Sequence, residues 1–336
     1  MIGYAGRRRP GLLFLSWGAI AGRSAEIAAA LGGQPRAYFA PGPRRRPPVL
    51  VRYALSSLLT GATLLARRPG VVVITNPPVP AAFVTWCWTR LIGAALVLDT
   101  HPGGFGAQGD AMSARLQWLH RFVARRSAFC LVADDAWVAR LAEWGVDGVV
   151  VHEAPDSWDG PVRDRGERLR VLCVGRFAPD EPVGDVIEAA GLVPEIDVLL
   201  TGDPDACPDE LRRGAPSNVT FVGFLDAVDY HRAVVDADAV LTLTTEPASV
   251  MRAAYEAVYA RRPLVVSDWP VSRALFPSAV HVVHTPEALA EGLRRIAADY
   301  PSFQASAESA RQSQLARWNT QQAELERRLA QLRDGQ

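Results

Sequence analysis

Two acidic residues lie ten positions apart in the segment 244–269, which reads as a loop, a helix and a strand. Glu246 falls in the loop and Glu256 inside the predicted helix. Ser249 is a plausible N-cap, and Pro263 ends the helix before an apolar strand. The helix would begin at the carboxyl end of a parallel strand, where unpaired amides and the helix dipole attract anions. The segment therefore predicts a phosphate-binding site.

The same helix offers further groups to a bound phosphate. The amides of Ser249, Val250 and Met251 would lie at its N-terminus. Arg252, in the first turn, could add positive charge, although an exposed helical arginine is the commoner explanation. The chain contains no lysine, since all 36 basic residues are arginine. Any cationic phosphate ligand must therefore be an arginine, and Schiff-base lysine chemistry is excluded.

Apolar strand-like runs alternate with helical segments in two series, separated by a polar segment over 155–168. This alternation predicts two doubly wound parallel sheets, each covered by helices on both faces. We expect a first domain over 1–158, a second over 168–300, and a helical tail over 301–336 that packs back toward the first domain. The predicted strands are 12–17, 36–39, 71–75, 95–98, 128–133, 148–152, 169–174, 197–201, 219–222, 239–243, 264–266 and 280–283.

The N-terminus fits two interpretations. Arginines at 7–9 followed by an apolar stretch over 12–20 imitate a signal peptide. The same residues fit a first strand over 12–17, then a turn containing Gly18 and Gly22, and a helix. We favour the strand, because cleavage would remove the first strand of an α/β domain.

Two apolar runs, 49–66 and 79–98, approach the length of about 20 residues that spans a bilayer. The second breaks into a helix and a strand that ends at Asp99. We therefore expect helices buried against a sheet rather than membrane spans. Peripheral membrane contact through the flanking arginines at 44–46 and 67–68 stays open.

Positive charge is concentrated in the first hundred residues. Residues 1–100 contain twelve arginines against Glu26 and Asp99, a net charge of 12 − 2 = +10, so the remainder carries −10 in a chain of formal charge zero. A basic half that faces an anionic partner, such as a membrane surface or a pyrophosphate-linked acceptor, is one interpretation. Uneven surface charge in an arginine-rich protein is the other.

The cysteines indicate the compartment. Four are present, without paired spacing, and Cys130 and Cys173 sit inside apolar strand-like runs. This is typical of reduced core thiols, so we expect a cytoplasmic protein, peripheral to the inner face of the membrane if the basic half binds lipid.

The segment 244–269 resembles the donor-binding region of retaining GT-B glycosyltransferases of family 4, in which a Glu-x7-Glu motif precedes a Pro-Val-Val-x-Ser-Asp-like strand. The resemblance covers essentially the whole chain and is strongest over 171–283. It implies a GT-B fold, in which two Rossmann-like domains face each other across a cleft. It also implies sugar transfer from a nucleoside-diphosphate donor, with retention of configuration.

The resemblance assigns donor contacts residue by residue. Arg176 matches an arginine that grips the donor diphosphate, but Glu181 stands where the family has a lysine. Glu256 matches the second motif glutamate, which binds the ribose hydroxyls; a carboxylate that accepts two hydroxyl donors suits that task. The first motif glutamate is replaced by Ala248, and Glu246, two residues earlier, is either a substitute or a loop acid.

In the first domain, His101 falls where the family places a histidine-containing loop that points into the cleft. It would contact the donor sugar or the acceptor, unless it is only a turn histidine. Gly18 and Gly22 resemble the family's glycine-containing loop near the donor pyrophosphate, although glycines after a strand are common.

We expect no metal and no cofactor beyond the nucleotide-sugar co-substrate. The Asp236-Ala-Asp238 triplet imitates an Asp-x-Asp metal motif, but it lies between a predicted helix and a predicted strand, where capping and solvation explain it. The chain shows no zinc-ligand spacing.

The expected function is therefore a glycosyltransferase for a glycan or polyprenyl-linked acceptor of cell-envelope or exopolysaccharide synthesis. Glu181 and Ala248 favour one alternative, a GT-B scaffold or regulator without donor turnover. A nucleotide-sugar 2-epimerase on the same fold is another. Nucleic acid is not an expected partner.

Overall fold

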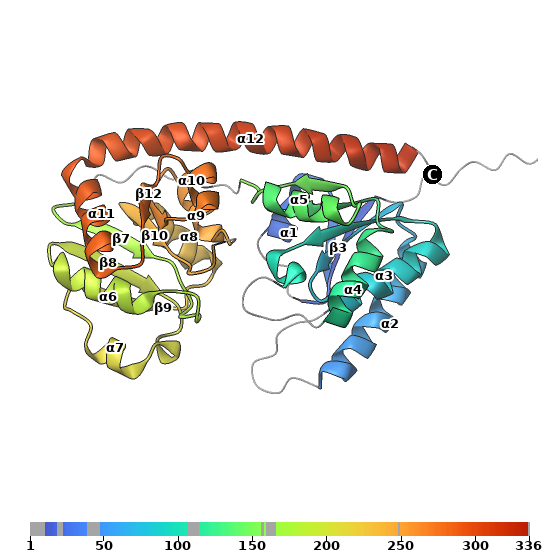
Figure 1. Ribbon diagram of the computed structural model, residues 1–336, viewed down its shortest axis with the longest axis horizontal. Coiled ribbons are helices and arrows are strands. Elements are labelled where there is room, and N and C mark those ends of the chain that lie inside the picture. Colours follow the sequence, from blue (N-terminus) through green and yellow to red (C-terminus); the bar gives the residue numbers. More distant parts are fainter. Residues whose placement is uncertain are drawn as a thin grey trace, which may run out of the picture. The chain divides into compact units, whose positions relative to one another are not determined.

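The computed structural model describes residues 11–18, 23–38, 48–106, 114–155, 158, 166–247 and 249–334. The chain forms two compact units (Figure 1). The first unit comprises Met1–Ala154 and Trp318–Gln336, and the second comprises Pro155–Arg317.

The first unit is built on a six-stranded parallel sheet with the order β2-β1-β3-β4-β5-β6. Its strands are β1 (Leu12–Ser16), β2 (Gln34–Ala37), β3 (Val71–Asn76), β4 (Ala95–Thr100), β5 (Phe129–Val132) and β6 (Gly148–Val150). Because β1 is fully buried and paired on both sides, the strand interpretation of 12–17 is confirmed.

Helices cover both faces of this sheet. One hydrophobic cluster joins it to α2, α3, α4 and α5, and another joins its opposite face to α1 and the end of α12. The helical elements are α1 (Arg23–Ala30), α2 (Val49–Arg67), α3 (Val79–Ile92), the short 3-10 helix η1 (Pro102–Phe105), α4 (Ala114–Ala124) and α5 (Asp135–Glu143).

The second unit repeats this architecture, with the strand order β12-β11-β10-β7-β8-β9, again all parallel. Its strands are β7 (Leu169–Cys173), β8 (Ile196–Thr201), β9 (Val219–Gly223), β10 (Ala239–Thr242), β11 (Leu264–Ser267) and β12 (Val280–Val282). Its helices are α6 (Val183–Leu192), η2 (Pro204–Ala206), α7 (Asp209–Arg213), α8 (Ala227–Asp236), α9 (Arg252–Tyr259), α10 (Pro270–Leu275) and α11 (Pro286–Ala298), with the first part of α12 (Tyr300–Asp334).

All twelve strands predicted from the sequence are present, each within two residues of its expected ends. The central strands are nearly continuous apolar runs, because both faces of a parallel sheet are buried beneath helices. The two doubly wound parallel sheets of the predicted fold class are therefore confirmed.

The tail is one continuous helix, α12, of 35 residues (Figure 1). Its first part packs in the second unit, where Tyr300 joins the core. Its last part packs in the first unit, where Trp318, Leu325 and Leu329 contact the sheet cluster. The helix thus belongs to both hydrophobic cores.

The expectation of two buried helices from the long apolar runs is correct only in part. The second run forms α3 and β4 as expected. The first run forms α2, but this helix turns small and polar residues toward the protein and leaves most of its leucines exposed. The sequence prediction failed here because apolar composition does not say which face of a helix is covered.

Both sheets contain a topological switch point, where the chain changes the direction in which it adds strands. In the first sheet it lies between β1 and β3, and in the second between β7 and β10. The connections that follow the two strands of each pair run to opposite faces of the sheet. A crevice therefore opens at the carboxyl ends of the two strands, and ligands bind there. The loops after these four strands are therefore the places to look for chemistry.

The contact between α2 and α3 gives a stability prediction. A Cβ at Gly61 would lie 2.5 Å from the Trp88 ring. Alanine is better than glycine in a helix by about 1 kcal/mol, but overpacking costs about 1 to 3 kcal/mol. We therefore expect Gly61→Ala to lower the unfolding midpoint, measured by circular dichroism.

Gly191→Ala in α6 is the matched control, because its new Cβ would meet only Pro216 Cγ, at 3.9 Å. It should keep or raise the midpoint. Equal stabilisation by both substitutions would contradict the close packing of α2 on α3.

Candidate functional site

The loop after β7 presents Arg176 at the second unit's switch point. The Arg176 side chain is exposed, and the described residues provide it with no hydrogen-bond partner. Phe177, the next residue, has a positive φ of 59°, an uncommon conformation for a residue with a Cβ. The loop is thus a turn of defined conformation that leaves the Arg176 guanidinium exposed to solvent.

Glu181 folds back onto this loop. Its Oε2 accepts hydrogen bonds from the amides of Arg176, at 2.7 Å, and Ala178, at 3.1 Å. A Cβ at Gly175 would lie 2.8 Å from the same oxygen, so a larger residue there would displace the carboxylate. The carboxylate therefore occupies two amides of the β7 loop, and neither amide is left for a phosphate.

Further bonds tie this loop to the one after β10. Thr244 Oγ1 donates to Asp180 Oδ2 at 3.0 Å, and the Thr245 amide donates to the Asp180 carbonyl oxygen at 2.7 Å. Thr201 Oγ1, at the end of β8, accepts from the Gly175 amide at 3.0 Å. The two loops at the switch point are thus held as one rigid rim.

Helix α9 follows this rim, but it begins later than predicted. Its N-cap is Met251, and no side chain caps it, so the prediction of Ser249 as N-cap was wrong. Val250 packs against the hydrophobic core and Met251 stays extended, with ψ near 133°, which delays the first turn. The Ser249 amide donates to the Glu246 carbonyl oxygen at 3.1 Å and is not free to bind a ligand.

The remaining predicted groups lie around the start of α9. Val250 and Met251, with Ser249, line a small cavity of about 10 Å³ beside the ends of β10 and β11, which is room for about one water. The Glu246 amide donates to Thr244 Oγ1 at 3.1 Å, and its side chain is partly exposed. Residue 248 lies outside the described residues.

Glu256 is a buried carboxylate in the second turn of α9. Its Oε1 accepts from Arg252 Nε at 2.6 Å, and its Oε2 accepts a short hydrogen bond from the Tyr230 hydroxyl. Burial raises the pKa of Tyr230, and the adjacent carboxylate raises it further, so this hydroxyl remains a donor. Arg252 is therefore paired with Glu256, although each carboxylate oxygen retains a second lone pair for a ligand hydroxyl.

Trp269, two residues after the end of β11, supports the β10 loop. Its Nε1 donates to the Thr244 carbonyl oxygen at 2.8 Å. Ser267 Oγ accepts from the Thr244 amide at 2.8 Å and lies 2.8 Å from His284 Nε2. These residues at the end of β11 complete the rim.

A buried ionic network lies at the carboxyl edge of the first sheet. Asp99, in β4, makes a short ion pair with Arg23 and accepts from Ser24 Oγ at 2.6 Å. Arg23 Nε also donates to the Val151 carbonyl oxygen at 2.9 Å. Burial raises the pKa of Asp99, but Arg23, His101 and Ser24 outweigh it and hold that pKa below its ordinary value. Asp99 is therefore ionised.

His101 lies at the edge of this network, partly exposed, with Nε2 3.6 Å from Asp99 Oδ2. The turn after it is fixed by His120, whose Nδ1 donates to the Gly104 carbonyl oxygen at 2.8 Å. Burial lowers the pKa of His120 to about 4, so His120 is neutral near pH 7. His101 is thus a positioned side chain in contact with a carboxylate and with solvent.

A cavity of about 260 Å³ lies at the first sheet's switch point. It is lined by Trp17 after β1, by Pro77 and Pro78 after β3, and by three residues of α2: Arg52, Tyr53 and Ser56. The Gly18 amide, beside it in sequence, donates to Ser16 Oγ at 3.0 Å. Gly22 lies outside the described residues.

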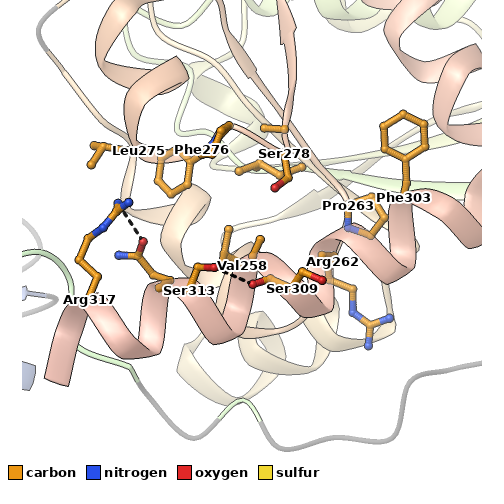
Figure 2. Close-up of a pocket in the computed structure, with 16 residues that line it drawn as sticks. Val258, Arg262, Pro263, Leu275, Phe276, Ser278, Phe303, Ser309, Ser313 and Arg317 are labelled. Carbon is orange, nitrogen blue, oxygen red and sulfur yellow. Dashed lines mark hydrogen bonds between the residues drawn. The ribbon is translucent and has the colours of Figure 1, made fainter.

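A second cavity, of about 130 Å³, lies in the second unit against α12 (Figure 2). Its walls include Val258, Phe276 and Phe303. Pro263 and Ala279, which also line it, precede β11 and β12. The cavity is therefore at the amino-terminal edge of the sheet, away from the switch point, and belongs to the packing of α12.

The aspartates at 236 and 238 play a structural part. Asp238 is buried, and its Oδ2 accepts from the Arg170 amide at 2.7 Å, while Asp236 is the last residue of α8. Within the described residues no three His, Cys, Asp or Glu side chains are grouped as a metal site.

The sequence interpretation missed two of the side-chain contacts at these sites. Tyr230 gave no signal, because it lies on another helix, 26 residues from Glu256. The Arg23–Asp99 pair did give a sequence signal. Asp99 lies at the end of a buried apolar strand, and a buried carboxylate needs a cationic partner. Arg23 meets this need across 76 residues of chain, a distance that no local pattern reveals.

Comparison with known families divides the chain at the same place. Residues 19–157 match the family described as "Glycosyl transferase 4-like domain", and residues 168–299 match "Glycosyl transferases group 1". Among curated proteins, chitobiosyldiphosphodolichol beta-mannosyltransferase of Pongo abelii is 31% identical over 127 residues, 34% of this chain, and that of Homo sapiens 28% over 117 residues, 32% of this chain. The aligned segments cover only 27% and 25% of those relatives' own length.

Several solved structures have a similar fold. Sucrose-phosphate synthase of Thermosynechococcus elongatus superposes with a TM-score of 0.75 at 17% identity, covering 97% of this chain and all of that one. HepE of Anabaena, in complex with UDP and glucose, has a TM-score of 0.72 at 16% identity, covering 95% and 99%. A putative UDP-N-acetylglucosamine 2-epimerase of Listeria monocytogenes has 0.62 at 12% identity, covering 88% and 90%.

These likenesses confirm the predicted GT-B fold, and the two family matches together span both units. The chain belongs to the group 1 glycosyltransferases, with a glycosyl transferase 4-like N-terminal domain.

Proposed function

We propose that this glycosyltransferase transfers a sugar from a nucleoside-diphosphate donor to a glycan or polyprenyl-linked acceptor, with retention and without a metal. The observation that carries the proposal is the arrangement at the β7/β10 switch point. There Arg176 stands in solvent, with the start of α9 and the Glu256 carboxylate on the same edge of the sheet. We place the protein on the cytoplasmic side of a membrane, in cell-envelope or exopolysaccharide synthesis.

The proposed donor site works by electrostatic stabilisation. The sugar–phosphate bond breaks as the acceptor hydroxyl oxygen bonds to the sugar carbon. Negative charge grows on the departing diphosphate, which takes up the proton that the hydroxyl loses. Arg176 would hold that charge, together with the amides of Val250 and Met251 at the positive end of α9. Glu256 would accept hydrogen bonds from the ribose.

The related proteins support this donor and acceptor chemistry. HepE was solved with UDP, UDP and glucose, and UDP-glucose. The curated relatives carry a name that specifies a lipid-linked glycan and a beta-mannosyl product. A beta product from an alpha-linked donor requires inversion, whereas retention would give an alpha product. The anomeric configuration of the product, determined by NMR, therefore tests the proposed retention.

A second candidate is a GT-B scaffold or regulator without donor turnover. The specific observation in its favour is that Glu181 takes two amides of the β7 loop and adds negative charge beside Arg176. Hydrolysis or transfer of the donor sugar by the purified protein separates the two candidates, and calorimetric titration with UDP, GDP, ADP and dTDP tests whether any nucleoside diphosphate binds. Binding of none of them would sink the enzyme proposal, whereas an epimerised nucleotide sugar made without acceptor would indicate a 2-epimerase.

The first prediction for the donor site concerns Arg176. A hydrogen bond to a charged group contributes about 1.5 to 3 kcal/mol. Arg176→Ala should therefore weaken binding of the preferred nucleoside diphosphate by roughly 10- to 100-fold in calorimetry. Arg213→Ala, which removes another exposed arginine of the second unit, should leave the affinity unchanged. Equal effects would indicate general charge attraction instead of a specific contact.

A second prediction concerns the ribose. If Glu256 accepts its hydroxyl groups, the wild type should prefer the nucleoside diphosphate over its 3′-deoxy form by about tenfold or more. Glu256→Gln should shrink that preference toward one, because a neutral amide oxygen is a weaker acceptor. A preference that persists unchanged in Glu256→Gln would place the ribose elsewhere.

A third prediction separates His101 from the nucleotide site. His101 belongs to the first unit, so His101→Ala should leave the dissociation constant of the nucleoside diphosphate unchanged. Turnover should fall by about 100-fold if the imidazole assists the reacting hydroxyl. The unchanged affinity also reports correct folding. Full turnover in this variant would make His101 a turn residue.

A further inference from the structure

Helix α2 has its amphipathic pattern reversed. The residues that it buries are Ser56, Thr60, Gly61 and Leu64. Leu50 and Leu58, by contrast, are 81% and 70% exposed. Every exposed residue of the helix is apolar: Val49, Leu50, Val51, Ala54, Leu55, Leu58, Leu59, Ala62, Leu65 and Ala66. A helix of a water-soluble domain normally turns its leucines inward, so this face is made for a nonaqueous partner.

Specific contacts fix α2 in this orientation. Trp17 Nε1 donates to Thr60 Oγ1 at 2.9 Å, and both groups are buried. Gly61 lies so close to the Trp88 ring that any side chain at 61 would collide with it. Rotation of the helix to bury its leucines would break this hydrogen bond and this packing. The apolar face is therefore held outward by the fold.

Helices α3 and α4, on the same face of the sheet as α2, carry only positive charge. The sequence has no acidic residue between Glu26 and Asp99, and none in α4. Together α2, α3 and α4 contain five arginines: Arg52, Arg67, Arg90, Arg115 and Arg121. Figure 1 shows these three helices on one side of the first sheet. Leu91 in α3 and Trp118 in α4 are also exposed, at 74% and 65%.

Leucines, tryptophan and arginines without acidic residues are the composition of helices that lie in the interface of anionic membranes. We propose that α2 is an in-plane membrane-binding helix that seats the first unit on an anionic lipid bilayer. A second copy of the chain is the poorer occupant, because two such faces would bring like charges together. The headgroups of anionic lipids offer the complementary charge.

Length and composition would also allow α2 to span a membrane, since the helix has 19 residues and a high mean hydropathy. However, a spanning α2 would have to leave Trp17, Trp88 and the hydrophobic cluster that includes Leu64. An in-plane α2 keeps all of these contacts and still buries its exposed leucines in lipid. The packing therefore favours the in-plane arrangement.

This placement also bears on the acceptor. Arg52, Tyr53 and Ser56 line the cavity at the first sheet's switch point, on the side of α2 that faces the protein. A helix is about 10 Å across, so a membrane-bound α2 would bring that cavity within about one helix diameter of the lipid. A lipid-linked acceptor could then reach it without leaving the bilayer. This consequence rests on the proposed function, whereas membrane binding itself does not.

The test is flotation of the full chain with vesicles of phosphatidylcholine, with and without phosphatidylglycerol. We expect binding to the anionic vesicles that weakens with salt. The double variant Leu55→Gln/Leu58→Gln should lose binding by about tenfold or more, because it removes two exposed leucines. Leu192→Gln, which changes an exposed leucine of the second unit, is the matched control and should float like the wild type.

Nucleoside-diphosphate affinity, measured in the same samples, separates this proposal from the proposed function. This affinity should be equal in the wild type and the double variant. If neither binds a nucleoside diphosphate, the proposed enzyme function is wrong, but the membrane-binding proposal is unaffected. The membrane proposal fails if the wild type does not float, or if the double variant floats equally well. A dimer in light scattering that the double variant converts to monomer would assign the face to a second copy. Resistance to alkaline carbonate extraction would indicate a spanning helix.

Discussion

Parallel strands can be joined only by crossovers that run over a face of the sheet, and these crossovers bury the strands on both sides. This constraint governs both units. The central strands can carry few polar side chains, so the polar chemistry gathers at the carboxyl ends. Arg176, Thr244 and Ser267 all follow or end strands of the second sheet, and Asp99 and His101 do the same in the first.

The constraint also explains why polar groups at these edges are so thoroughly paired. Asp99 is almost fully buried and would be strongly destabilising alone, but Arg23 and Ser24 satisfy it. The rim of the second sheet is held by hydrogen bonds between side chains and loop backbone, through Thr201, Thr244 and Glu181. Such bonds hold a loop in one shape without a ligand. A pre-formed rim would lower the entropic cost of binding the proposed donor.

The sequence predicted the repeating architecture better than the details of the loops. Most of the twelve strands were found because an apolar run that ends at a turn is a local signal, although β2 is short, polar and exposed. The Ser249 N-cap was wrong because the start of α9 depends on Val250, which packs into the core from outside the helix. The bonds of Glu181 could not be foreseen either, since they depend on the positive φ of Phe177 and on glycine at 175. For α2, composition suggested burial, but the outward direction of its leucines depends on Trp17 and Trp88, which lie in other elements.

Glu181 changes how a diphosphate would be held. A lysine at this position would place a positive charge beside the ligand. The Glu181 carboxylate instead accepts hydrogen bonds from amides of the loop that carries Arg176. The two amide dipoles offset part of the negative charge of Glu181. The rest of that charge would still repel a nearby diphosphate. The energetic demand therefore shifts to Arg176 and to the start of α9, because Arg252 is already paired with Glu256. Since Arg176 is exposed, its attraction for phosphate is weakened by water and by salt. Tight donor binding at this rim would thus require that water be excluded from around Arg176. The guanidinium would then attract phosphate strongly only when the bound donor itself covers it.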